Sequence, residues 1–438
     1  MVISLNRANF VLVVSVILMT VALFARDLYG MGVGRIIFIV LAVVPAIIMN
    51  YQSLVYFIFF LFSLTSGLPG NYIFPILILI LLCKNKNSFN RAGLKCFLLL
   101  VFMELIHYVT YGFQISLPSI IGYFSNLFFL FYFVTLKDES VDVKKCIVFF
   151  CMGLAVFLFA IFYITQINED VGMLLEKSGR IGDTKDVSDL AQGEMMLNAN
   201  PNELGFFAVI GVASIMVLYF RKQVSFWIMA LLSALYLFVG ALAVSRTYLL
   251  VIVIMVVLLV FFAPKNNGGG GWKRYLLLFV FIATAGYFLF NNASLVNAYN
   301  NRFESVSTDT YGGRTTIFAD YNSFLVDHPL YFLFGTGAVY YGRVIQLGIS
   351  IHNGTQQILV SYGLIGLAFF VFITIRAIKL CYKKGVPVCL IPFIIAFFYV
   401  QSGQLLNPSN NLYLFIVSFF IMKLSVEEHT GVRVIIEE

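Results

Sequence analysis

Long uninterrupted runs of apolar residues, separated by short polar connections, dominate the chain. A run of about 20 apolar residues is what an α-helix needs to cross the hydrocarbon core of a bilayer. The runs are continuously apolar rather than alternating, which favours helices over the strands of a membrane barrel. Such runs lie near residues 9–25, 36–49, 53–68, 71–83, 94–112, 118–136, 146–166, 204–220, 225–242, 245–263, 275–291, 356–378, 386–402 and 410–424. The pattern predicts an all-α polytopic membrane protein, a single integral membrane domain over residues 1–438 with about fourteen transmembrane helices.

Two longer polar stretches interrupt this pattern, at residues 167–203 and 292–355. Within the second stretch, apolar residues recur at one-helical-face spacing after Gly313, at positions 317, 318, 321, 324 and 325. A helix that begins at Arg314 and lies along the membrane surface is therefore expected. Turn signals follow at His328-Pro329 and at Gly335-Thr336-Gly337. Near the end of the stretch, Asn353 is expected to cap the next helix.

Composition agrees with a membrane protein: 61% of the residues are hydrophobic and 11% are charged, and the mean hydropathy is +0.94. A soluble domain carries about 25% charged residues. The net charge of +7 does not indicate nucleic-acid binding, because Lys and Arg gather in short connections between the predicted helices. The clusters are Lys84, Lys86, Arg91 and Lys95; Lys137, Lys144 and Lys145; Arg221 and Lys222; Lys265, Lys273 and Arg274; and Arg376, Lys379, Lys383 and Lys384.

With fourteen helices, all these clusters fall on one side, which the positive-inside rule assigns to the cytoplasm. Both termini are then cytoplasmic, and residues 167–203 and 292–355 form periplasmic loops. Arg26 and Arg35 fall on the periplasmic side and are exceptions to the rule. No cysteine lies in a long loop, so no disulfide framework is expected.

Candidate chemistry on the predicted outer side rests mainly on arginines, which bind phosphate oxygens in a bidentate manner. They are Arg180, Arg246, Arg302, Arg314 and Arg343. Each is alternatively a solvated loop charge or an interfacial anchor, and Arg246 at its helix mouth is alternatively a snorkelling side chain. Arg314 is the sharpest candidate, because a helix N-terminus beside an arginine suits an anion.

His352 stands where the second polar stretch meets the next apolar run. Its imidazole suits a general base or a phosphate donor. Glu104 and His107 lie three residues apart on one predicted helix, where a structural pair is as good an interpretation as a functional one. The sequence holds no HExxH, CxxC or DxD motif and no soluble nucleotide-binding domain. No metal or cofactor is therefore expected, and a group transfer would need a donor already in the membrane.

Several of these motifs occur in an order that resembles the bacterial O-antigen polymerase and O-antigen ligase superfamily. Arg180 precedes Leu197-Asn-Ala-Asn-Pro-Asn-Glu-Leu-Gly205, and Ser245-Arg246 opens a later helix. Gly313-Arg314, His328-Pro329-Leu330 and Gly335-Thr-Gly337 follow in the large loop, and His352-Asn353 with Gly363-Leu-Ile-Gly366 ends the series. The resemblance spans about residues 180–370, and the first six helices match only in being hydrophobic.

The resemblance implies a metal-independent glycosyltransferase of the inner membrane, acting on undecaprenyl diphosphate-linked oligosaccharide at its periplasmic face. Arg246 and Arg314 would stabilise charge on the leaving diphosphate, and His352 would be the general base or would orient the diphosphate. Substrate binding would involve Arg180, Arg343, Asn202, Asn353 and Tyr311. Partners would be membrane lipid and a chain-length regulator protein, with no nucleic acid.

A polymerase would pass the growing glycan to the terminal sugar of a new lipid-linked unit, whereas a ligase would pass it to the lipid A core. The richness in Phe, Tyr and Ile and the loose loop motifs favour the polymerase. A lipid-linked oligosaccharide transporter or flippase is an alternative of another class. It would call for charged residues along mid-membrane helices and an internal repeat, and no clear repeat is visible.

Overall fold

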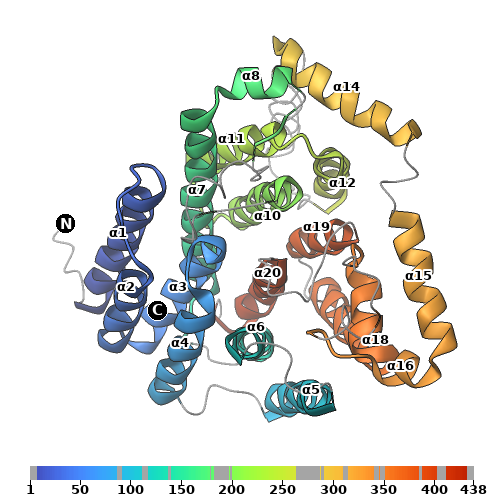
Figure 1. Cartoon of the computed structure of the whole chain (residues 1–438). Helices are drawn as coiled ribbons and strands as arrows, with labels where there is room; N and C mark the ends of the chain where they lie inside the picture. The colour runs from blue at the N-terminus through green and yellow to red at the C-terminus, as the bar shows by residue number, and fades with distance from the viewer. Residues whose placement is uncertain are drawn as a thin grey trace.

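The structure is a computed structural model. It describes residues 7–85, 91–110, 117–136, 140–177, 179–181, 197, 200–262, 287, 291–308, 314–339, 345, 351–383, 387–401 and 411–431. Within these ranges the regular elements are helices (Figure 1). They are α1 Arg7–Asp27, α2 Arg35–Ile48, α3 Tyr51–Phe62, η1 Thr65–Gly67, α4 Gly70–Lys84, α5 Arg91–Thr110, α6 Leu117–Thr135, α7 Val143–Asn168, α8 Val171–Glu176, α10 Pro201–Phe220, α11 Phe226–Leu242, α12 Arg246–Phe262, α14 Ala293–Thr308, α15 Arg314–Asp327, α16 Pro329–Phe334, α18 Gly354–Lys383, η3 Pro387–Leu390, α19 Ile391–Val400 and α20 Asn411–Gly431.

The predicted fold class, an all-α polytopic membrane protein, is confirmed. Among the described residues, six helices are long and apolar enough to cross a membrane, and shorter apolar helices of 10–17 residues accompany them. Nearly every predicted helix has a counterpart there. The exception is the helix expected at 275–291, which lies almost wholly outside the described residues.

Aromatic side chains fill much of the core between the helices. Phe59 and Phe62 of α3 meet Phe129 and Phe133 of α6, with ring centroids 5.1–5.9 Å apart in edge-on arrangements. Aromatic rings prefer such tilted contacts.

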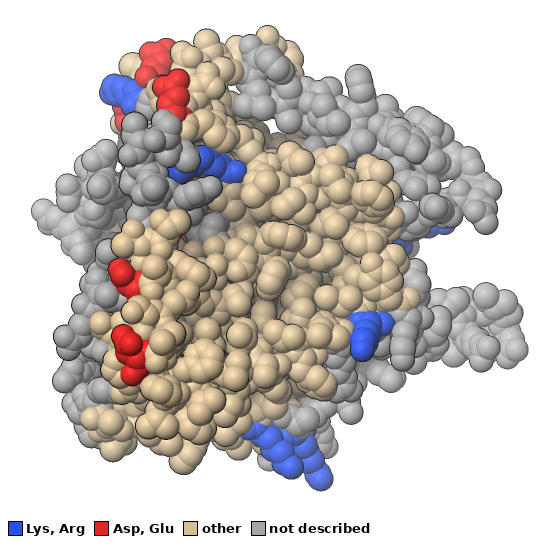
Figure 2. Space-filling view, turned by 90° about the vertical axis from the view of Figure 1, so that its right-hand side faces the viewer, with Lys and Arg blue, Asp and Glu red and all other residues tan. Residues whose placement is uncertain are grey.

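The surface of the molecule carries few charges on the face shown in Figure 2. Its visible Lys, Arg, Asp and Glu side chains lie near the margins, around a broad uncharged area. An uncharged surface of this kind suits hydrocarbon.

One set of helix ends is joined through basic side chains. Lys84, at the end of α4, donates to the main-chain oxygens of Ile47, 2.9 Å away, and Met49 at the end of α2. Arg221, at the end of α10, donates to Leu424 O of α20 at 3.4 Å. Each contact joins two helix ends that the fourteen-helix pattern puts on the same side of the membrane.

Helices α14 and α15 lie at one edge of the molecule. Figure 1 shows both along their length, α14 at the top right and α15 at the right, whereas α12, which α14 contacts, is seen nearly end-on. The predicted helix at Arg314 is confirmed as α15, and its apolar face packs inward through Tyr321 (0% exposed) and Leu325 (2% exposed). The expected turn at His328 is also present, between α15 and α16.

Helix α18 departs from the sequence prediction of one continuous helix over 356–378. It is broken at Gly363, where φ is 66° and ψ is −166°. Glycine reaches this conformation without the steric penalty that a Cβ imposes. The break divides an apolar span into two segments, and the backbone groups that it releases need partners from elsewhere in the chain.

Candidate functional site

The N-terminus of α10 organises the site. Asn200 caps the helix by accepting a hydrogen bond from the Asn202 N–H at 2.9 Å, and Pro201 occupies the first helical turn. The Asn202 side chain accepts a hydrogen bond from Ser245 Oγ at 3.1 Å. Its main-chain oxygen accepts one from the Tyr399 hydroxyl. Asn202 therefore joins the ends of α10, α12 and α19.

Close packing around Tyr399 explains Gly205 in the same motif. A Cβ at Gly205 would lie 2.8 Å from the Tyr399 hydroxyl oxygen and 3.1 Å from Tyr248 Cβ. The Tyr399 ring stacks on Phe206 with centroids 4.4 Å apart. A larger residue at 205 would push Tyr399 away from Asn202, so the glycine is needed to bring α19 close.

Arg246 opens α12 directly after Ser245, as the sequence predicts. One of its terminal nitrogens donates to Arg302 O at 3.3 Å, so α14 is fastened beside it. Val244, two residues earlier, is a buried β-branched residue with φ 44°. That conformation costs on the order of 1–3 kcal/mol and occurs most often at functional sites. The turn that presents Arg246 is therefore held in place by the surrounding packing.

Helix α14 packs onto the same turn from the outside. Tyr299 is 4% exposed, and its hydroxyl donates to Ala241 O at the end of α11 at 3.0 Å. Burial raises the pKa of Tyr299, so the hydroxyl stays protonated and remains a donor. This bond and the Arg246 contact fix Arg302 beside Arg246. From the sequence alone, Arg302 is no more than a candidate for a solvated loop charge, and its contact with Arg246 adds it to the candidate site residues.

Asn353 caps α18, as predicted, by accepting a hydrogen bond from Gln356 N–H at 2.9 Å. Its amide nitrogen lies 3.4 Å from Gln401 O, and Thr355 Oγ1 donates to Gln401 Oε1 at 3.0 Å. Gln401 follows Tyr399 by two residues, so the same end of α19 contacts both Asn202 and Asn353. His352, the exposed neighbour of Asn353, stands at this junction.

Helix α15 is attached to the start of α18. Gln356 Nε2 donates to Phe318 O at 2.9 Å and to Asn322 Oδ1 at 3.0 Å. A small apolar cluster lies beneath this contact, in which Tyr321 and Ile351 are both fully buried. Arg314 begins α15, one helical turn before Phe318. The helix that carries Arg314 is thus attached to Gln356, three residues after Asn353, while the Arg314 side chain lies outside the described part.

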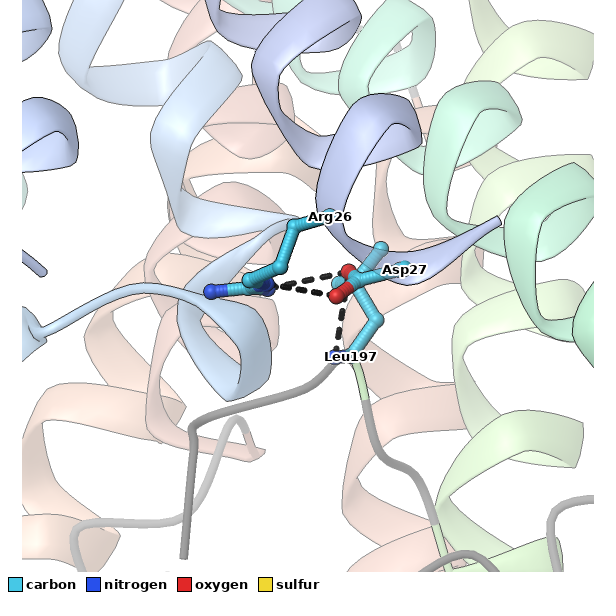
Figure 3. A network of polar contacts seen from close by, with 3 residues as sticks. All are labelled: Arg26, Asp27 and Leu197. Atoms are coloured by element: carbon cyan, nitrogen blue, oxygen red, sulfur yellow. Dashed lines mark hydrogen bonds and ion pairs between the residues drawn. The ribbon is translucent and has the colours of Figure 1, made fainter. Parts of the chain in front are cut away.

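An ion pair at the end of α1 supports the segment that leads into α10 (Figure 3). Arg26 and Asp27 are each 6% exposed, and the guanidinium donates to both carboxylate oxygens at 2.5 and 2.9 Å. Asp27 Oδ2 also accepts the Leu197 N–H at 3.3 Å. Arg26 is therefore neutralised by Asp27 inside the protein. This pairing accounts for one of the two basic residues, Arg26 and Arg35, that were exceptions to the positive-inside rule.

The remaining predicted residues divide into two groups. Arg180 is half-buried. The N–H of the next residue, Ile181, donates to Leu242 O at 3.2 Å, so Arg180 lies near the end of α11. Tyr311 and Arg343 lie outside the described residues. The described residues bring Asn202, Arg246 and Asn353 into one hydrogen-bonded assembly of helix ends. Within the described ranges, no group of His, Cys, Asp and Glu has a metal-binding arrangement.

Sequence reasoning missed Tyr399 and Gln401, because they end an apolar helix and lie in no recognisable motif. Their only sequence signal is polarity at the end of an apolar run.

Comparison with curated proteins gave no match. A family model described as O-antigen ligase matches residues 231–371, a region that includes most of α11, all of α12, α14, α15 and α16, and the first part of α18. The match contains Arg246, Arg302 and His352, but it begins after Asn202.

Proposed function

We propose that this chain, a member of the O-antigen ligase and polymerase superfamily by its region 231–371, is the polymerase that elongates a surface polysaccharide. Its donor would be a growing glycan on undecaprenyl diphosphate, and its acceptor would be the terminal sugar hydroxyl of a new lipid-linked repeat unit. The reaction would take place at the periplasmic face of the bacterial inner membrane, without a metal. A chain-length regulator protein would act with it.

The observation that carries the proposal is the junction of Asn202, Ser245-Arg246 and Tyr399, with Arg302 fastened beside it. A junction of helix ends presents arginines beside apolar helices, so it suits a ligand with an anionic head and a hydrocarbon tail. A diphosphate would lie against the guanidinium groups. Asn202 and Asn353, whose side chains bind within the protein, would act mainly by holding this geometry.

In the proposed reaction, the bond between the glycan C1 and the diphosphate oxygen breaks, and a bond between C1 and the acceptor oxygen forms. The bonding pair leaves with undecaprenyl diphosphate, so negative charge grows on that group. Arg246 and Arg314, with Arg180 and Arg343, would stabilise this charge; removing one such donor costs about 10²–10³ in rate. The proton of the acceptor hydroxyl would pass to His352 as general base. Tyr311 would stack on a sugar face.

The alternative role of His352, orienting the diphosphate, makes a different prediction for pH dependence. If His352 is the base, replacing it by Gln removes the acidic limb of the pH–rate profile, because the neutral imidazole is the active form. If it only donates to the diphosphate, activity of the unmodified protein falls as pH rises and the imidazolium is lost. Rates in membrane vesicles across pH 5–8 distinguish the two roles.

The match to a family described as O-antigen ligase favours a second candidate, transfer of the glycan to the lipid A core. Deleting the gene and resolving the lipopolysaccharide on a gel tests both. Single repeat units on the core, without longer chains, support the polymerase. A bare core with polymer accumulating on undecaprenyl diphosphate supports the ligase. A bare core with single lipid-linked units retained at the cytoplasmic face contradicts both and points to a flippase.

A further inference from the structure

The break in α18 is filled by a segment of the large loop. Because Gly363 leaves the helical conformation, the carbonyls of the preceding turn lose their helical partners. Thr336 N–H donates to Val360 O at 2.8 Å, and Gly337 N–H donates to Ser361 O at 3.0 Å. The residues that follow α16 therefore satisfy the backbone groups that the break exposes, as a broken helix inside a membrane requires.

The backbones at this junction approach more closely than any side chain would allow. A Cβ at Gly335 would lie 2.2 Å from Ser361 O, and a Cβ at Gly363 would lie 2.2 Å from Leu333 O. Both glycines also have positive φ. Gly335, predicted in a turn, and Gly363, predicted inside a helix, are thus the two sides of one contact.

The position of the contact along α18 sets its depth. The break lies inside an apolar span, Gly354–Phe372, nine residues after the span begins. At about 1.5 Å per helical residue, this places the contact more than 10 Å below the start of α18. Beside it, α16 turns large apolar side chains outward, with Leu330 72%, Leu333 41% and Phe334 51% exposed. Because these exposed side chains of α16 are apolar and lie at this depth, we expect them to face the hydrocarbon core of the bilayer.

Glu104 of α5 holds the same segment from the other side. Glu104 is 2% exposed, and its Oε1 accepts the Ala338 N–H at 2.6 Å. Tyr362, next to the break, also hydrogen-bonds to Glu104. A Cβ at Gly337 would lie 3.0 Å from Glu104 Oε2 and 3.1 Å from a ring carbon of His107. Glu104 and His107 thus lie against the large loop. Neither interpretation of this pair from the sequence, as a structural pair or as a functional one, included that contact.

We propose that residues 329–338 form a re-entrant segment within the bilayer and that Glu104 is the positioning residue that keeps it there. The segment continues directly from α15, whose other attachment is Gln356 at the start of α18. With both ends fixed, α15 has one position relative to the helix that follows His352. The membrane placement stands without the proposed function, whereas any effect of Glu104 on glycan synthesis rests on it.

Labelling of introduced cysteines tests the placement. Phe334→Cys lies on the outward side of α16, and Ser323→Cys on the exposed side of α15 is the matched aqueous control. Intact spheroplasts are treated with a membrane-impermeant maleimide, and the unsubstituted chain with its six free cysteines gives the background. Phe334→Cys should react at least about tenfold more slowly than Ser323→Cys, because maleimide needs a thiolate and thiolates form poorly in apolar surroundings.

Glu104 variants test the anchor. In the Phe334→Cys chain, Glu104→Ala should raise labelling towards that of Ser323→Cys, whereas Glu104→Gln should keep the protection because its amide oxygen still accepts the Ala338 N–H. Polymer synthesis should follow the same order, with Gln close to the unmodified protein and Ala strongly reduced. Equal labelling of the two cysteines beside native Glu104 would overturn the re-entrant placement. Unchanged protection in Glu104→Ala would overturn the anchor, and neither result would bear on whether the chain is a polymerase.

Discussion

The ion pair at the end of α1 gives a prediction whose size follows from the structure. Asp27→Ala removes two hydrogen bonds from Arg26 and one from the Leu197 N–H, and it leaves a guanidinium that is 5% exposed without its carboxylate. Breaking a buried pair in this way costs about 3–5 kcal/mol, mainly because the remaining charge stays buried. The contact of Arg26 with the Phe38 ring, 4.6 Å from its centroid, would offset a small part of this cost.

The measurement is the fraction of detergent-solubilised protein that remains monodisperse after heating. Asp27→Ala should lower the midpoint, the temperature at which half of the protein remains monodisperse, by several degrees. Loss of the contact with Leu197 should lower polymer synthesis as well. The double variant Arg26→Met, Asp27→Asn removes both charges but keeps an acceptor for Leu197, so it should recover most of the stability. Arg35→Ala, at an exposed arginine on the same side, is the control and should be neutral. An unchanged midpoint in Asp27→Ala would refute the buried pair.

Three further outcomes are expected. Tyr399→Phe keeps the stack on Phe206 but loses the hydroxyl contact with Asn202, worth about 0.5–1.5 kcal/mol, and should lower polymer synthesis up to about tenfold; synthesis equal to that of the exposed control Tyr382→Phe would count against the junction. Gln356→Leu releases α15 from α18 and should speed proteolysis of the large loop in spheroplasts, and an unchanged cleavage rate would contradict that attachment. Polymer synthesis in membrane vesicles should persist in excess EDTA, because arginines supply the charge that a metal would otherwise provide; loss of synthesis that Mg²⁺ restores would contradict this mechanism.

Much of the fold followed from the sequence because a membrane imposes strong local rules. Apolar length set the helices, and the amphipathic spacing after Arg314 correctly gave α15. The cap at Asn353 was also readable, since it depends on residues within one turn. Of the candidate site residues, Arg246 and Asn353 lie at one assembly of helix ends, and their part in the reaction stays a prediction.

The remaining features depend on contacts between distant segments. A glycine inside an apolar run is compatible with an ordinary helix, so nothing local marks Gly363 as a break. The pairing of Arg26 with Asp27 was also hidden, because adjacent residues do not face each other on a helix surface and meet here only where α1 ends. Tyr399 and Glu104 gain their partners from α10 and from the large loop, and no sequence motif records those partners.

Substitutions at Arg246 test whether the meeting helix ends bind a lipid diphosphate. The deletion strain is complemented with Arg246→Ala, Arg246→Lys or, as a matched control at the other end of α10, Arg221→Ala, and chain lengths are read on a lipopolysaccharide gel at equal protein levels. We expect Arg246→Ala to leave single repeat units on the core without longer chains. Arg246→Lys should restore only short chains because it lacks the bidentate fork, and Arg221→Ala should be normal. A normal ladder of long chains with Arg246→Ala would contradict diphosphate binding by Arg246.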